Sequence, residues 1–239
     1  MKHSAFLSIV LAAVASCGGT ETGNGFTQEI RVGAHSSDEG EYAVSVAAGG
    51  GVVSEAWMII GGMTLIEDGD CGANGDGVDM PPLNAADHAL GDVDLTVPMN
   101  EGDYCQLTLP IGGEGLIPTG APPALGGETA IVVIGQTGAG TDFTIVGGAP
   151  TIAIRGSGAF ALSVADGPLF LGFDVASWLA GLDIDSGDLT SGQVLIDAAN
   201  NATLSAQFAQ NVAGGIELYR DANGNGQVDA GELPVASGQ

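Results

Sequence analysis

Short runs of alternating apolar and polar residues recur along the chain, separated by Gly, Pro and Asp. A period of two is typical of strands that bury one face, and the intervening residues favour turns. In the first half the predicted strands cover residues 27–32, 42–46, 55–60, 63–67, 92–97 and 104–109. In the second half they cover residues 130–134, 142–146, 151–155, 159–164, 169–173 and 193–196. This spacing predicts a mainly β fold, an antiparallel β-sandwich of one or two lobes.

A Gly- and Pro-rich stretch, residues 112–127, interrupts the series of predicted strands. We expect it to connect a first β lobe, residues 26–111, with a second β lobe, residues 128–239. Whether these lobes form one sandwich or two domains stays open at this stage.

Two short helices are expected in the second half. Asp174 is a good N-cap for residues 175–180, and Gly181 ends that turn. The second helix follows Asn200 or Asn201 and carries an apolar stripe with a four-residue spacing, formed by Leu204, Phe208 and Val212.

The beginning of the chain predicts export. Residues 1–16 combine Lys2 with an apolar run, residues 5–15, that is too short to span a bilayer as a stable helix. The run ends Val-Ala-Ser-Cys17 and resembles the lipobox of bacterial lipoproteins, in which cleavage precedes the cysteine and its sulfur receives a diacylglycerol. An ordinary secretory signal that leaves Cys17 as a spare thiol is the alternative.

Gly18 follows the cysteine where inner-membrane lipoproteins carry Asp, and by resemblance to Gram-negative sorting rules this favours the outer membrane. Residues 17–25 are small and polar and predict a flexible tether between lipid and fold.

The predicted mature chain is acidic. It has no lysine, and Arg31, Arg155 and Arg220 alone oppose 29 acidic residues. This balance argues against nucleic acid as a partner and against adsorption to anionic headgroups, because both require basic patches. With 45% hydrophobic residues the chain is nevertheless expected to fold.

Cys71 and Cys105 remain once Cys17 is set aside, an even pair in an oxidising compartment. We expect a disulfide between them, closing a loop of about 35 residues. A metal-binding cysteine pair is the alternative, but neither a CxxC spacing nor a neighbouring histidine cluster supports it.

Residues 221–232 match the twelve-residue loop of EF-hands. Gly226 occupies the sixth position, where the chain must turn sharply. The predicted calcium ligands are side-chain oxygens and, at the seventh position, a backbone carbonyl: Asp221, Asn223, Asn225, Gln227, Asp229 and Glu232. A solvated Asp/Asn/Gly hairpin without metal is the alternative.

The element that precedes this loop reads as a strand, residues 216–219, and Pro234 follows almost at once. An EF-hand has a helix on either side and signals by opening a groove between the two helices. We therefore expect a structural calcium clip of moderate affinity rather than a sensor.

Other candidate sites are weaker. The acidic loop 68–79 could hold a second calcium, but its oxygen spacing matches no defined register, and the turn 183–188 is weaker still. His35 and His88 stand in no zinc or triad motif, and there is no GxSxG, P-loop or dinucleotide fingerprint. We expect Trp57 and Trp178 to fill the core, and we do not expect an enzyme.

Residues 53–65, Cys71 and residues 101–110 resemble an uncharacterised family of bacterial outer-membrane lipoproteins, as do residues 167–183 and 218–221. The resemblance implies a β-sandwich domain with an EF-hand-like calcium loop, held at the outer membrane. It implies no known reaction.

The expected function is that of a cell-envelope lipoprotein, a calcium-stabilised β-sandwich of binding or adhesion type. Its expected partners are the membrane, through the lipid on Cys17, and an envelope protein or glycan. A structural accessory of an envelope complex, or a hydrolase with an unrecognised carboxylate pair, are the alternatives.

Overall fold

The computed structural model describes residues 25–34, 45–46, 51–67, 77–80, 86–87, 93–113, 117, 119–225, 228–229 and 231–238. The predicted signal peptide, Cys17 and all of the tether except Gly25 lie outside the described residues. No helix within these ranges is both long enough and apolar enough to cross a bilayer.

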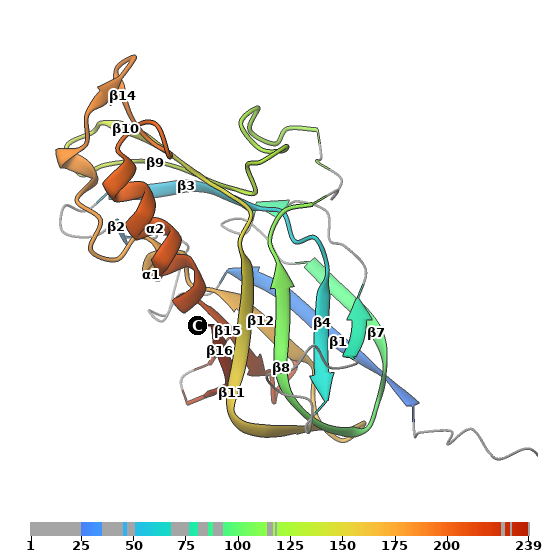
Figure 1. The fold of residues 1–239 in the computed structure, drawn as a ribbon. Coiled ribbons are helices and arrows are strands. Elements are labelled where there is room, and N and C mark those ends of the chain that lie inside the picture. The colour runs from blue at the N-terminus through green and yellow to red at the C-terminus, as the bar shows by residue number, and fades with distance from the viewer. Residues whose placement is uncertain are drawn as a thin grey trace, which may run out of the picture.

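The fold is mainly β, as the alternation predicted, and its described strands form two sheets (Figure 1). The larger sheet has nine strands, which lie in this order: β5 (Gly77–Met80), β4 (Met63–Glu67), β8 (Gly102–Pro110), β11 (Thr151–Leu162), β16 (Pro234–Gly238), β15 (Ile216–Arg220), β12 (Leu169–Phe173), β1 (Gly25–Ala34) and β7 (Val93–Asn100).

The smaller sheet has six strands in line, with a seventh, β6 (Ala86–Asp87), paired beside β3. The order is β13 (Leu189–Thr190), β14 (Gln193–Ile196), β10 (Asp142–Gly147), β9 (Ile131–Gln136), β3 (Gly51–Met58) and β2 (Ser45–Val46). Both sheets draw strands from both halves of the chain.

The sheets are mixed, whereas the sequence predicted antiparallel strands throughout. β1 pairs with β12 in parallel, and β10 pairs with β14 in parallel. A parallel pair needs a long connection, and the chain between β10 and β14 contains three strands, an α-helix and a short 3-10 helix. Local alternation does not carry this information, because it indicates which face is buried and not which strand lies alongside.

Two predicted strands, residues 151–155 and 159–164, are one long strand, β11. The pairing of β11 with β8 shifts register between Arg155 and Phe160, so Gly156 and Gly158 lie in a bulge and not in a turn. A side chain at Gly156 would place its Cβ 2.4 Å from the carbonyl oxygen of Gly158, which explains the glycine.

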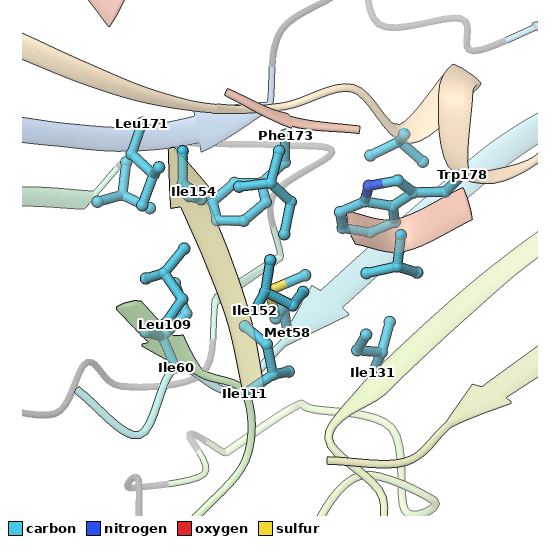
Figure 2. Packing of buried hydrophobic residues seen from close by; sticks show 14 of the residues in the cluster. Met58, Ile60, Leu109, Ile111, Ile131, Ile152, Ile154, Leu171, Phe173 and Trp178 are labelled. Atoms are coloured by element: carbon cyan, nitrogen blue, oxygen red, sulfur yellow. The ribbon is translucent and has the colours of Figure 1, made fainter. Parts of the chain in front are cut away.

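The core takes side chains from both sheets and from both helices. Figure 2 shows Ile152 and Ile154 of β11 facing Leu171 and Phe173 of β12, with Met58 of β3 beside them. All five side chains are buried. One cluster of buried residues includes members from both sheets, as alternating strands with one apolar face require.

Trp178 ends the short helix α1 (Val175–Trp178) and is fully buried, as predicted. Its ring meets Phe173 of β12 and Phe208 of helix α2 (Ala202–Gly214) edge to face, with ring centroids 6.0 and 6.4 Å away. Trp57 is half-buried and packs against a smaller cluster of Ile59, Leu125 and Val132, so it covers the outer face of β3 and does not fill the main core.

The two helices begin differently, since only the first has a side-chain cap. Asp174 caps α1 as expected, because its carboxylate accepts from the backbone N–H of Ser177 at 3.1 Å. Asn201 precedes α2 but does not cap it, since its side chain bonds the backbone of Asp188 and of Leu195. Asn201 therefore ties α2 to β13 and β14, with a left-handed backbone at φ 54°.

One end of the nine-stranded sheet gathers the start of β1 and several connections, and we call it the loop end. Gly25 is opposite Asn100 in the pairing of β1 with β7, and Leu162 is opposite Gly102 in that of β11 with β8. Leu169 is opposite Arg220, so the loop after β15 begins at this end too. Figure 1 shows the start of β1 at the lower right, beside the lower connections of β7, β8 and β11.

Candidate metal centre in the loop after β15

The predicted calcium loop is the connection between two neighbouring antiparallel strands. β15 ends at Arg220, the loop begins at Asp221, and β16 starts at Pro234. A strand therefore precedes the loop, as predicted, but the strand that follows it was not predicted. Pro234 argued against a helix after the loop, and it is instead the first residue of β16, a position in a strand where proline is tolerated.

Asp221 is the most buried predicted ligand described, with 1% of its surface exposed. Its Oδ1 accepts from the backbone N–H of Gly224 at 2.7 Å and from that of Asn225 at 3.2 Å. A carboxylate that accepts from the following amides turns the chain back on itself, and Gly224 completes the turn at φ 70°. Asp221 thus shapes the first half of the loop.

Asn223, Asn225 and Asp229 meet at one point. The side-chain amides of both asparagines donate to Oδ2 of Asp229, and the bond from Asn225 is 2.8 Å long. Rotating an amide by half a turn exchanges its nitrogen for its oxygen without moving the rest of the side chain. The same placement can therefore present two carbonyl oxygens and a carboxylate to a cation.

Glu232 joins the two ends of the loop. One carboxylate oxygen accepts from the backbone N–H of Ala222 at 3.2 Å, and the other accepts from that of Asp229 at 3.1 Å. The N–H of Glu232 donates in turn to the carbonyl oxygen of Asp229 at 3.0 Å. The twelfth position of a calcium loop normally supplies a carboxylate that closes the site in this manner.

The donor types fit calcium, which takes oxygen ligands from carboxylates, amide carbonyls and the backbone. Gln227, whose carbonyl is the predicted seventh-position ligand, lies outside the described residues, as does Gly226. Among the described residues, no three His, Cys, Asp or Glu side chains are gathered closely enough to hold a metal on their own. A site here therefore depends on the asparagines and on a backbone carbonyl in addition to the carboxylates.

The base of the loop is held by contacts that the sequence did not indicate. Arg220 forms an ion pair with Asp166 and donates to the carbonyl oxygen of Ala161. Gln28 of β1 is buried, and its amide donates to the carbonyl oxygen of Gly167 at 3.2 Å. The sequence signal that could have drawn attention to this contact is a glutamine at an inward-facing position of the alternation, between Phe26 and Ile30.

Tyr219 and Glu217 lie on the outer face of β15, two residues apart. The phenol of Tyr219 donates to one oxygen of Glu217, and the hydroxyl of Ser237 donates to the other at 3.2 Å. Burial raises the pKa of Tyr219 well above its usual range, and the hydrogen bond and negative charge of Glu217 add to this. The pair fixes the strand that leads into the loop.

Cys105 is buried in β8, and Cys71 lies outside the described residues. The Sγ atom of Cys105 lies 3.6 Å from the carbonyl oxygens of Ile66 and Glu67. Glu67 ends β4, four residues before Cys71 in the chain. Cys105 therefore lies beside the point where the chain leaves β4 towards its predicted partner.

The weaker candidate sites gain little from the structure. Of the acidic loop 68–79 only the last three residues are described, and there Asp79 accepts from the hydroxyl of Thr64 at 2.8 Å. In the turn 183–188, Ser186 bonds the backbone of Asp183, as an ordinary polar turn does. His35 and His88 lie outside the described residues.

Comparison with protein families found no family model that matches the chain, and none of the curated proteins matches it. Among solved structures, the chain is similar to MbnP from Methylosinus trichosporium, with 12% sequence identity and a TM-score of 0.47. The similarity covers 90% of this chain and 98% of that one.

Proposed function

We propose that this protein is a calcium-stabilised lipoprotein of the cell envelope, with a β-sandwich domain of binding or adhesion type. The observation that supports the calcium site best is the arrangement of Asn223, Asn225 and Asp229, whose side chains meet at one carboxylate oxygen. Asp221 and Glu232 hold the backbone on either side of this point. Asp221 accepts from the N–H of Gly224, and Glu232 accepts from the N–H of Asp229.

Calcium here would act as a structural clip. A bound calcium ion would place positive charge among the carboxylates. Without it, these carboxylates accept hydrogen bonds from the asparagine amides and from the backbone. The loop joins β15 to β16, and the N–H of Asp221 donates to the carbonyl oxygen of Pro168 at 2.9 Å, just before β12. A cation that orders the loop therefore stabilises three neighbouring strands of the larger sheet. A sensor role is disfavoured, because strands and not helices flank the loop.

The envelope location rests on the sequence of the signal peptide and Cys17. Metabolic labelling of cells with a tagged fatty acid tests it directly: the wild-type chain is expected to carry label, and Cys17→Ser is expected to carry none. Label on the Cys17→Ser chain, or its absence from the wild type, would exclude the proposed anchor.

The binding role is proposed for the loops and outer faces of the two sheets, because no motif of the chain supports a reaction. Immobilised mature protein should retain a protein or glycan from envelope extracts in the presence of calcium. Extracts that leave nothing on the protein at any calcium concentration would argue for the structural accessory role instead.

Calcium binding is tested by the thermal midpoint with calcium and with EDTA. At a calcium concentration about tenfold above the dissociation constant, the free energy of unfolding rises by about 1.4 kcal/mol. For a domain of this length that is a shift of about 3–6 °C. Asp229→Asn should lose most of the shift, whereas Asp185→Asn, in an exposed turn, should keep it. Equal thermal midpoints of the wild type in calcium and in EDTA would exclude the proposed calcium site.

A further inference from the structure

The chain leaves the described domain at the loop end, where β1 begins at Gly25. Cys17, the proposed lipid attachment site, precedes Gly25 by eight residues. A fully extended chain spans at most about 3.3–3.6 Å per residue, so this tether reaches no further than about 30 Å. The tether therefore joins the lipid to the domain at the loop end.

Two large hydrophobic side chains stand out from the loop end into solvent. Val164 lies in the turn between β11 and β12 and is 75% exposed. Leu233 lies between the calcium loop and β16 and is 79% exposed. They are the most exposed large hydrophobic residues among those described. Single exposed aliphatic side chains are common on protein surfaces, so what distinguishes these two is that they project from the same end of the sheet.

The turns that carry these side chains are held in place. The backbone N–H of Val164 donates to the carboxylate of Glu101 at 3.2 Å, which joins this turn to the one between β7 and β8. Two residues later, Asp166 pairs with Arg220 at the start of the calcium loop. Val164 and Leu233 therefore project from connections that contacts tie to the sheet and to one another.

We infer that the loop end is a membrane-docking surface, with Val164 and Leu233 placed to enter the interface of the bilayer that holds the lipid on Cys17. The inference rests on the proposed lipid anchor. Aliphatic side chains that enter a membrane interface gain free energy because their apolar surface is buried. A lipid anchor on the same chain raises the effective concentration of that contact. The smaller sheet, whose β14 lies at the opposite end of the molecule in Figure 1, then faces away from the bilayer.

Carboxylates lie near Val164 and Leu233. Glu101 accepts from the N–H of Val164, and Glu232 directly precedes Leu233. Asp103 is opposite Ala161 in the pairing of β8 with β11. Anionic headgroups repel such a surface, so the docking surface fits a zwitterionic interface. A calcium ion in the neighbouring loop would reduce the repulsion further. This sets the conditions for the test: phosphatidylcholine vesicles in a buffer that contains calcium.

The test uses the lipidated full-length mature chain in phosphatidylcholine vesicles that contain brominated phosphatidylcholine, which quenches tryptophan on contact. Val164→Trp and Leu233→Trp report on the loop end. Leu189→Trp, at a position 63% exposed in the other sheet, is the matched control. The wild-type chain, with Trp57 and Trp178, sets the background. All three substitutions are at exposed sites, so folding is expected to persist and is checked by circular dichroism.

Quenching of Val164→Trp and Leu233→Trp is expected to be at least twice that of Leu189→Trp. Equal quenching at the three positions, with all chains floating with the vesicles, would overturn the docking surface but leave the anchor intact. Failure of the chains to float would overturn the lipid anchor, and the docking surface with it.

Discussion

The backbone N–H of Asp221 donates to the carbonyl oxygen of Pro168 at 2.9 Å. Pro168 directly precedes β12, and the residue before it, Gly167, accepts from the side chain of Gln28 in β1. A side chain on Gly167 would lie 2.6 Å from the carbonyl oxygen of Asp221, so the two segments are in close contact. The first residue of the predicted calcium loop is thus fastened to β12 and, through Gly167, to β1.

Asp221→Ala should destabilise the protein in the absence of calcium as well as in its presence. The substitution removes the acceptor for the N–H groups of Gly224 and Asn225, at a cost of about 1–2 kcal/mol. Urea unfolding in EDTA measures this loss. Asp185→Ala, at an exposed position, should change stability by less than about 0.5 kcal/mol. Equal stability of Asp221→Ala and the wild type in EDTA would show that the hydrogen bonds accepted by the Asp221 carboxylate do not stabilise the loop.

Asn225→Asp should have opposite effects with and without calcium. Without calcium it replaces a donor to Asp229 by a second carboxylate, so the two side chains repel and stability falls. With calcium it adds a charged ligand, and affinity is expected to rise. Isothermal titration measures affinity, and melting in EDTA measures the apo state. A variant that binds calcium more weakly than the wild type would contradict the proposed role of Asn225 as a ligand.

The sequence predicted the parts of this fold that depend on neighbouring residues. Alternation identified most of the strands, and the cap of α1 by Asp174 depends on four consecutive residues, 174–177. The glycines of β11 misled the prediction, because a bulge and a turn both favour glycine, and only the partner strand β8 distinguishes them.

Contacts between distant segments could not be predicted. The parallel pairing of β1 with β12 joins segments about as far apart as Gln28 and Gly167, which are 139 residues apart in the chain. In the candidate site, the spacing of Asp221, Asn225 and Glu232 was visible in the sequence. The ion pair of Arg220 with Asp166 was not, because nothing local links a strand end to a remote turn.

Gly215→Ala should destabilise the protein, whereas Gly214→Ala should not. A Cβ on Gly215 would lie 2.5 Å from Cδ1 of Trp178 and 2.9 Å from the carbonyl oxygen of Asp174. Trp178 is fixed in the core, so overpacking should cost about 1–3 kcal/mol. Gly214 ends α2, and outside its own helix and its chain neighbours no atom lies within 4 Å of its Cβ position, so alanine there should gain up to about 1 kcal/mol. Similar stabilities of the two variants would contradict the close packing of α2 on Trp178.

The proposed Cys71–Cys105 disulfide predicts a linked peptide in a digest without reductant. Asp-N protease suits the chain, because the predicted mature part has three arginines and no lysine. Reduction, or a Cys71→Ser/Cys105→Ser double substitution, should lower the free energy of unfolding by about 3–4 kcal/mol. A wild-type chain in which both thiols react with iodoacetamide before reduction would exclude the bridge.

Tyr219 should resist ionisation until the protein unfolds. Burial and Glu217 hold the pKa of its phenol above the ordinary value of 10.0, so the folded chain favours the neutral form. The stability that this phenol contributes is fully present below pH 10.0 and is lost as pH rises through the folded-state pKa. Near-ultraviolet absorbance, which follows tyrosinate, should therefore rise together with alkaline unfolding.

Tyr219→Phe separates this effect from general alkaline damage. The variant loses the hydrogen bond to Glu217 but has no phenol to ionise, so its stability should fall less steeply than that of the wild type above pH 10.0. Glu217→Gln removes the neighbouring charge and should bring the pKa of Tyr219 down towards its ordinary value. Parallel pH profiles for Tyr219→Phe and the wild type would mean that another group controls alkaline unfolding.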